Sequence, residues 1–134
     1  MAAGVAVPIA QASRASKSAG CALTALNPVT RVDPDPNIGK GVKGTLTARC
    51  GQRHNPVTLS VTLWFLVPSH RWVRQGINEV AGLSMRANHK YTIDTGFGLG
   101  CVTGEYQTRA ILIFRSHGKR VKLSANSPNT AITC

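Results

Sequence analysis

Apolar and polar residues alternate along much of this chain, which is the pattern of half-buried β-strands. In the clearest stretch, Val57–Leu66, apolar side chains take every second position and threonine or serine fills the positions between them. The stretch Gln75–Asn88 lacks this alternation and is interpreted as irregular or as a short helical turn. Further strands are expected at Leu23–Thr30, Val42–Cys50, Lys90–Thr95, Val102–Arg115 and Arg120–Ala125, with a weaker one at Arg71–Arg74.

Turn-forming residues separate these expected strands, and no internal repeat is present. About seven short strands with regular turns predict an all-β fold, an antiparallel immunoglobulin-like sandwich. A small β-barrel is the alternative. The turn segments are Asp33–Asn37, His54–Pro56, Pro68–Ser69, Gly96–Gly100 and His117–Gly118.

The last expected hairpin suggests how two of the four cysteines pair. If His117–Gly118 is a two-residue turn, Phe114 faces Val121 and the other apolar residues of the two strands also face one another. Continuing the same count places Cys101 opposite Cys134. This register therefore favours a disulfide between these two cysteines.

The first expected hairpin gives a similar result. Centring it on Asp35–Pro36 places Val29 opposite Val42 and Cys21 opposite Cys50. Four cysteines allow three connectivities, and the two registers favour one of them. We therefore predict the disulfides Cys21–Cys50 and Cys101–Cys134, with a sandwich-spanning Cys50–Cys101 bridge as the alternative.

The start of the chain indicates export. Residues 2–10 are small and mostly apolar, and Ala10-Gln11-Ala12 is an A-x-A cleavage pattern. We interpret residues 1–12 as the remnant of a secretory signal peptide, 13–20 as a mobile polar lead and 21–134 as a single disulfide-bonded β-domain. No apolar run is long enough to span a membrane. Since disulfides persist mainly outside the cytosol, a secreted or extracytoplasmic protein is expected.

The A-x-A remnant, the composition and the four cysteines together resemble the small exported, β-rich proteins common in actinobacteria. This resemblance implies an extracytoplasmic, disulfide-bonded β-domain and no specific activity. Exported subtilisin inhibitors of such bacteria have a comparable size and two disulfides, but their reactive-loop pattern is not found here. No functional residue is therefore transferred from either group.

The charge balance favours an anionic partner. The chain has 16 lysine and arginine residues against five acidic residues, for a formal charge of +11. A net charge of this size indicates which partners the protein can bind, but not its fold. No acidic residue follows Glu105. In the expected register of the last hairpin, four cations share the face opposite the apolar residues and form a basic stripe, and they are Arg109, Arg115, Arg120 and Lys122. The candidate anion-binding residues are Arg109, Arg115, Lys119, Arg120 and Lys122.

We therefore expect a non-enzymatic module that binds an anionic cell-envelope polymer or another polyanion. Nucleic acid is a less favoured partner, because base stacking needs exposed aromatic residues among the cations. Aromatic residues form only 5% of the chain. Only three of these aromatic side chains could face outward, those of Trp64, Trp72 and Phe97.

Two further function classes remain open. The first is an exported protein inhibitor that presents a disulfide-anchored loop at Pro68–Arg74 or Gly96–Gly100. The second is a small secreted nuclease or other hydrolase, in which a carboxylate works with a histidine. The acidic candidates are Glu79, Asp94 and Glu105, but the sequence assigns no catalytic residue. No cofactor or metal site is expected, because the four histidines lack ligand spacing and the cysteines are expected in disulfides.

Overall fold

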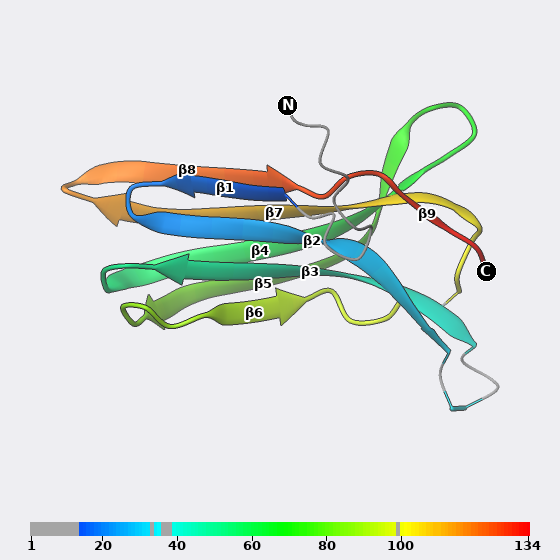
Figure 1. Cartoon of the computed structure of the whole chain (residues 1–134), viewed down its shortest axis with the longest axis horizontal. Coiled ribbons are helices and arrows are strands. Elements are labelled where there is room, and N and C mark those ends of the chain that lie inside the picture. The colour runs from blue at the N-terminus through cyan, green and yellow to red at the C-terminus, as the bar shows by residue number, and fades with distance from the viewer. Residues whose placement is uncertain (1–13, 33, 36–38, 99) are drawn as a thin grey trace, which may run out of the picture.

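The structure is a computed structural model, and it describes residues 14–32, 34–35, 39–98 and 100–134. Two antiparallel sheets pack face to face as a β-sandwich, which confirms the expected all-β sandwich (Figure 1). One sheet has the order β1-β2-β3-β6, and the other has the order β5-β4-β7-β8 with β9 paired to β7. The strands are β1 (Arg14–Ser18), β2 (Cys21–Val32), β3 (Lys40–Cys50), β4 (His54–Leu66), β5 (Trp72–Met85), β6 (Tyr91–Asp94), β7 (Gly104–Ser116), β8 (Lys119–Asn126) and β9 (Thr130–Ile132).

The alternating residues of the central strands build the core between the sheets. Along β4 every second side chain from Val57 to Phe65 is buried, and the residues between them face outward. Leu23 and Leu46 approach this layer from the opposite sheet, and Leu112 lies beside it on β7. Each of these leucines is fully buried, and such burial contributes about 1.5–3 kcal/mol to folding.

The β7–β8 hairpin has the predicted register. Phe114 pairs with Val121 and Leu112 pairs with Leu123. The turn residues His117 and Gly118 have φ values of 53° and 77°, as a two-residue type I′ turn requires. The local turn chemistry therefore fixes which face of this hairpin is buried.

The β2–β3 hairpin has the predicted register only near its cysteines. Cys21 pairs with Cys50, but the register shifts by one residue between Leu26 and Val29, so Val29 lies opposite Lys43. The predicted Val29–Val42 pair is therefore wrong. Pro28 lies in the shifted segment and has no N–H to donate to a ladder, which is why a bulge forms there.

Both predicted disulfides are confirmed. Cys21–Cys50 is buried in the main core, whereas Cys101–Cys134 ties the segment before β7 to the chain end after β9. The alternative Cys50–Cys101 bridge is excluded because all four cysteines are bonded in the other pairs.

The structure corrects the prediction for Gln75–Asn88. Most of this stretch belongs to β5, a long strand that pairs with β4. β5 is an edge strand of its sheet and many of its side chains are exposed. Register shifts against β4 and a positive φ of 69° at Gly82 further break the two-residue period. The alternation that identifies a half-buried strand is therefore missing here.

The N-terminal segment also differs from the expectation. Residues 14–18 form β1, which pairs with β2, where a polar lead without a strand was expected. The turn residues Ala19 and Gly20 have φ values of 51° and 77°, so this is a second type I′ hairpin. The A-x-A pattern and Ser13 lie outside the described residues.

Candidate polyanion-binding site

Four tight turns meet at one end of the sandwich, on the left in Figure 1. They connect β1 to β2, β3 to β4, β5 to β6 and β7 to β8. Backbone hydrogen bonds join three of them, because Gly51 N donates to Gly20 O at 2.9 Å and Asn88 N donates to Cys50 O at 2.7 Å. The Cys21–Cys50 disulfide lies directly behind these turns. This end is therefore cross-linked by covalent and hydrogen bonds.

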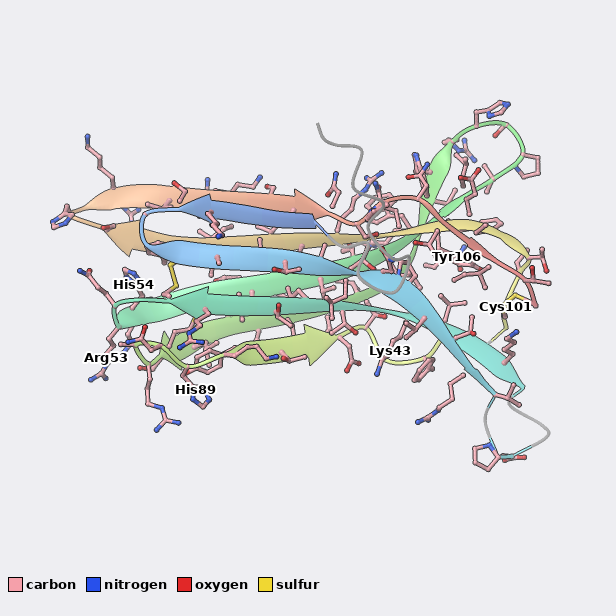
Figure 2. The ribbon with its side chains drawn as sticks, viewed as in Figure 1. Lys43, Arg53, His54, His89, Cys101 and Tyr106 are labelled. Atoms are coloured by element: carbon pink, nitrogen blue, oxygen red, sulfur yellow. A yellow bond between two sulfur atoms is a disulfide. The ribbon has the colours of Figure 1, made fainter. Side chains whose placement is uncertain are left out.

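Lysine and arginine gather at these turns, and we call the surface that they form the basic end. None of the five acidic residues of the chain belongs to the four turns. Figure 2 shows Arg53 at this end, with Lys43 toward the other. The cations of the basic end are all exposed, and they are Lys17, Arg49, Arg53, Arg86, Lys90, Arg115, Lys119 and Arg120.

The β7–β8 hairpin places three of the predicted residues together on the outer face of its sheet. Arg115 pairs with Arg120, and Lys122 pairs with Ile113 one step along the same face. The two arginines line a shallow depression of about 210 Å³ with Thr58. Arg115 donates a hydrogen bond to Gly118 O at 3.3 Å. Among the described residues, none of the three cations has a carboxylate partner.

The other two predicted residues lie apart from this group. Lys119 pairs with Ser116 next to the turn. Neighbouring positions of a strand face opposite sides of a sheet. Lys119 therefore belongs to the basic end but does not share the outer face with Arg115 and Arg120. Arg109 shares the outer face but lies six residues before Arg115 on β7, about 20 Å along an extended strand. It contacts Trp64 there. The predicted stripe is therefore two separate groups.

Sequence reasoning missed the cations that other turns bring to the basic end. A usable signal was present, because successive antiparallel hairpins place alternate turns at the same end of a sandwich. Counting charges by turn rather than by strand face finds the basic end. The missed residues are Lys17, Arg49, Arg53, Arg86 and Lys90.

Three histidines also lie at the basic end, and they are His54, His89 and His117. Figure 2 shows His54 and His89 there. His54 packs on Phe114 with 4.1 Å between ring centroids, and His89 packs against Tyr91 with 4.8 Å between ring centroids. A nitrogen of His54 lies within 4.8 Å of the sulfur atoms of Cys21 and Cys50. Because these sulfurs are bonded to each other, they offer no thiolate to a metal ion.

The carboxylates considered for catalysis are dispersed. Glu79 and Glu105 are exposed on β5 and β7. Asp94 lies 3.9 Å from the Lys43 ammonium, and its Oδ1 accepts a hydrogen bond from Gly96 N at 2.7 Å. None of these three carboxylates forms an ion pair with a histidine of the described chain. The direct carboxylate–histidine contact considered for catalysis is therefore not formed by these three residues in the described part of the chain.

The glycine-rich loop that was considered for an inhibitor packs along β3. Gly98 N donates to Val42 O at 3.3 Å, and a Cβ at Gly41 would come within 2.5 Å of Gly98 O. The Phe97 ring lies beneath two cations, with Arg31 at 4.6 Å and Lys43 at 4.8 Å from its centroid. This ring is therefore held by the protein itself rather than presented outward.

The second loop considered for an inhibitor, Pro68–Arg74, begins in the β4–β5 turn. Val67 N donates to Arg71 O, and His70 N donates to Val67 O, both at 2.9 Å. Neither disulfide lies in this hairpin. The disulfide anchor that defined the inhibitor hypothesis is therefore absent from this turn.

A cavity of about 210 Å³ lies between the sheets, away from the basic end. Val42 and Leu63 line it, together with Tyr106, Thr95 and several glycines. No charged side chain lines it within the described part of the chain. The lining of this cavity is therefore neutral, unlike the surface of the basic end.

Comparisons of the chain with protein-family models and with curated proteins found no match. The part of the chain that the structure describes holds no helix that is long and apolar enough to cross a membrane.

Proposed function

We propose that this protein is a secreted or extracytoplasmic, non-enzymatic module that binds an anionic polymer through its basic end. The observation that carries the proposal is the gathering of exposed lysines and arginines at four turns and on the strand ends beside them, where no acidic residue lies. Such a surface releases condensed counterions when a polyanion neutralises it, which favours binding.

The spread of the charges supports a polymer rather than a small anion. The cations come from four turns, from the strand ends beside these turns and from the adjoining β7–β8 face. They line separate depressions, one beside Arg115 and Arg120 and another beside Lys17 and Arg49. A polymer with repeated charges can contact several such groups at once. The disulfide and the hydrogen bonds between turns fix the backbone beneath them, which reduces the ordering cost of binding.

The two disulfides support an extracytoplasmic location, because such bonds persist mainly in oxidising compartments. The A-x-A pattern of residues 10–12 supports export of the chain. An anionic cell-envelope polymer is the partner that such a location offers.

Retention on immobilised heparin across a salt gradient tests the proposal. The double variant Arg115→Gln/Arg120→Gln is expected to elute at lower salt than the wild type, because two phosphate- or sulfate-binding cations are lost. Arg31→Gln/Arg71→Gln removes the same charge far from the basic end and serves as the control. Equal elution of the two double variants would show that only net charge matters, and would contradict a binding site at the basic end.

Turnover assays separate this proposal from the enzyme alternative. Purified protein is expected to leave RNA, DNA and peptidoglycan intact, because none of Glu79, Asp94 and Glu105 is paired with a histidine of the described chain. Turnover that is lost in Glu79→Gln, Asp94→Asn or Glu105→Gln, with the fold intact, would replace the proposal with a hydrolase.

A further inference from the structure

Both tryptophans of the chain lie beside one arginine on the outer face of the five-stranded sheet. Trp64 on β4 and Trp72 on β5 are half-buried. The guanidinium carbon of Arg109 on β7 lies 4.3 Å from the Trp64 ring centroid and 5.6 Å from that of Trp72. A cation this close to aromatic rings is attracted by their quadrupoles.

Hydrogen bonds fix this arginine and its nearest ring in place. Arg109 Nε donates to Gln107 Oε1 at 2.8 Å. Trp64 Nε1 donates to Thr62 Oγ1 at 2.8 Å, and that hydroxyl donates to Arg109 O at 3.3 Å. The guanidinium is therefore held from two sides, by stacking and by its Nε.

The outer end of the guanidinium is left without an acceptor. Among the described residues, neither Nη1 nor Nη2 of Arg109 donates a hydrogen bond, and no carboxylate pairs with it. Partial burial lowers the pKa of the Arg109 guanidinium from its ordinary value, because the charged form loses solvation. An arginine nevertheless keeps its charge at neutral pH. A partly desolvated guanidinium with two free terminal nitrogens can donate two parallel hydrogen bonds to a carboxylate or a phosphate.

A second cation flanks the same tryptophan. Arg74 on β5 is directly paired with Trp64, while Gln107 is paired with Trp64 from the other side. Arg74 is exposed, and it too has no carboxylate partner among the described residues. An arginine therefore stands on each strand that neighbours Trp64, Arg109 on β7 and Arg74 on β5.

We propose that Arg109, oriented by Trp64, Trp72 and Gln107 and assisted by Arg74, forms an oxyanion-binding site that takes a single carboxylate or phosphate group. The site lies on the sheet face, about 20 Å along β7 from Arg115. It does not rest on the proposed function of the basic end, since it shares no residue with that surface.

Tryptophan fluorescence reports this site alone, because the chain contains no other tryptophan. The test titrates the wild-type protein with glucuronate and, separately, with inorganic phosphate, at constant ionic strength maintained with sodium chloride. A saturable change in emission with either anion is expected. A response to only one of the two anions identifies the group that the site accepts.

Three variants locate the response. Arg109→Lys keeps the charge but replaces the planar guanidinium by an ammonium, which cannot donate two parallel hydrogen bonds. Half-saturation is therefore expected at about tenfold higher anion concentration. Gln107→Leu frees the guanidinium and is expected to weaken binding by a smaller factor. Arg115→Gln/Arg120→Gln is expected to leave the titration unchanged, while its heparin elution shifts.

Two results would overturn the inference. One is a wild-type emission that responds to neither anion beyond the sodium chloride control. The other is a titration of Arg109→Lys or of Gln107→Leu that coincides with the wild type, because then the oriented fork is not the receptor. Thermal unfolding of each variant verifies that the comparison is made on folded protein.

Discussion

Arg115 on β7 and Arg120 on β8 lie directly opposite each other in the β7–β8 hairpin, and both side chains are exposed. Like charges at directly opposed positions destabilise a sheet. No carboxylate offsets them among the described residues. The pair therefore lowers the stability of the hairpin while it concentrates positive charge at the basic end.

The first prediction concerns this pair. Arg120→Glu replaces a like-charge pair by an opposite-charge pair, so the free energy of unfolding is expected to rise by about 0.5–1 kcal/mol. Heparin retention is expected to fall at the same time. Urea denaturation and the salt gradient measure the two effects. Arg71→Glu, which makes the same charge change in the β4–β5 turn, is expected to stay within about 0.5 kcal/mol of wild type. A loss of stability in Arg120→Glu would refute the repulsion argument.

The second prediction ranks the disulfides. Their sequence separations, 29 and 33 residues, give nearly equal chain-entropy contributions of about 3–4 kcal/mol each. Cys21 and Cys50 are 3% and 0% exposed, whereas Cys134 is exposed. Cys21→Ala/Cys50→Ala also leaves a core cavity, so it is expected to cost about 1–2 kcal/mol more than Cys101→Ala/Cys134→Ala. Urea denaturation of the two variants gives the order, and equal losses would argue against a packing contribution.

The third prediction concerns β1. Deleting residues 1–12 leaves β1 complete, so the free energy of unfolding is expected to be unchanged. Deleting residues 1–20 removes the β1–β2 ladder and the Gly51–Gly20 hydrogen bond. This deletion is expected to cost about 2 kcal/mol, because several backbone hydrogen bonds are lost. If both truncated proteins unfold at the same urea concentration, β1 contributes nothing to the fold.

The predictable parts of this fold are those where local chemistry fixes the register. His117-Gly118 supplies a two-residue turn, and that turn alone determines that Leu112 and Phe114 face the core. The alternation in β4 predicts its buried face for the same reason. The bulge at Asn27–Pro28 was marked by the proline, but the prediction assumed an uninterrupted ladder.

Features set by packing between distant segments were not predictable. β5 is mostly exposed along an edge, so its sequence carries no clear period. The sequence placed Arg109 in a stripe with Arg115, but its contact with Trp64 depends on the β4–β7 register. No local pattern fixes that register. The basic end likewise arises only when four separate turns come together.

The last prediction concerns a close approach between the sheets. A Cβ at Gly44 on β3 would lie 2.9 Å from Thr108 Oγ1 and 3.1 Å from its Cγ2. Thr108 on β7 is fully buried, and its Oγ1 has no hydrogen-bond partner among the described residues. Gly44→Ala is therefore expected to lower the free energy of unfolding by about 1–3 kcal/mol through overpacking. Gly98→Ala, where a Cβ meets nothing within 4 Å, is the matched control and is expected to change it little.

A double-mutant cycle tests that this cost arises at Thr108. Thr108→Ala removes the two atoms nearest to the new methyl group, Oγ1 and Cγ2. The first of these belongs to an unpaired hydroxyl whose burial is unfavourable. Gly44→Ala/Thr108→Ala is therefore expected to be more stable than the sum of the single changes implies, by about 1 kcal/mol or more. Urea denaturation of the four proteins gives the coupling energy. Additive losses would show that the two sheets relax apart at this point, and that Gly44 is not required for the close approach of β3 to β7.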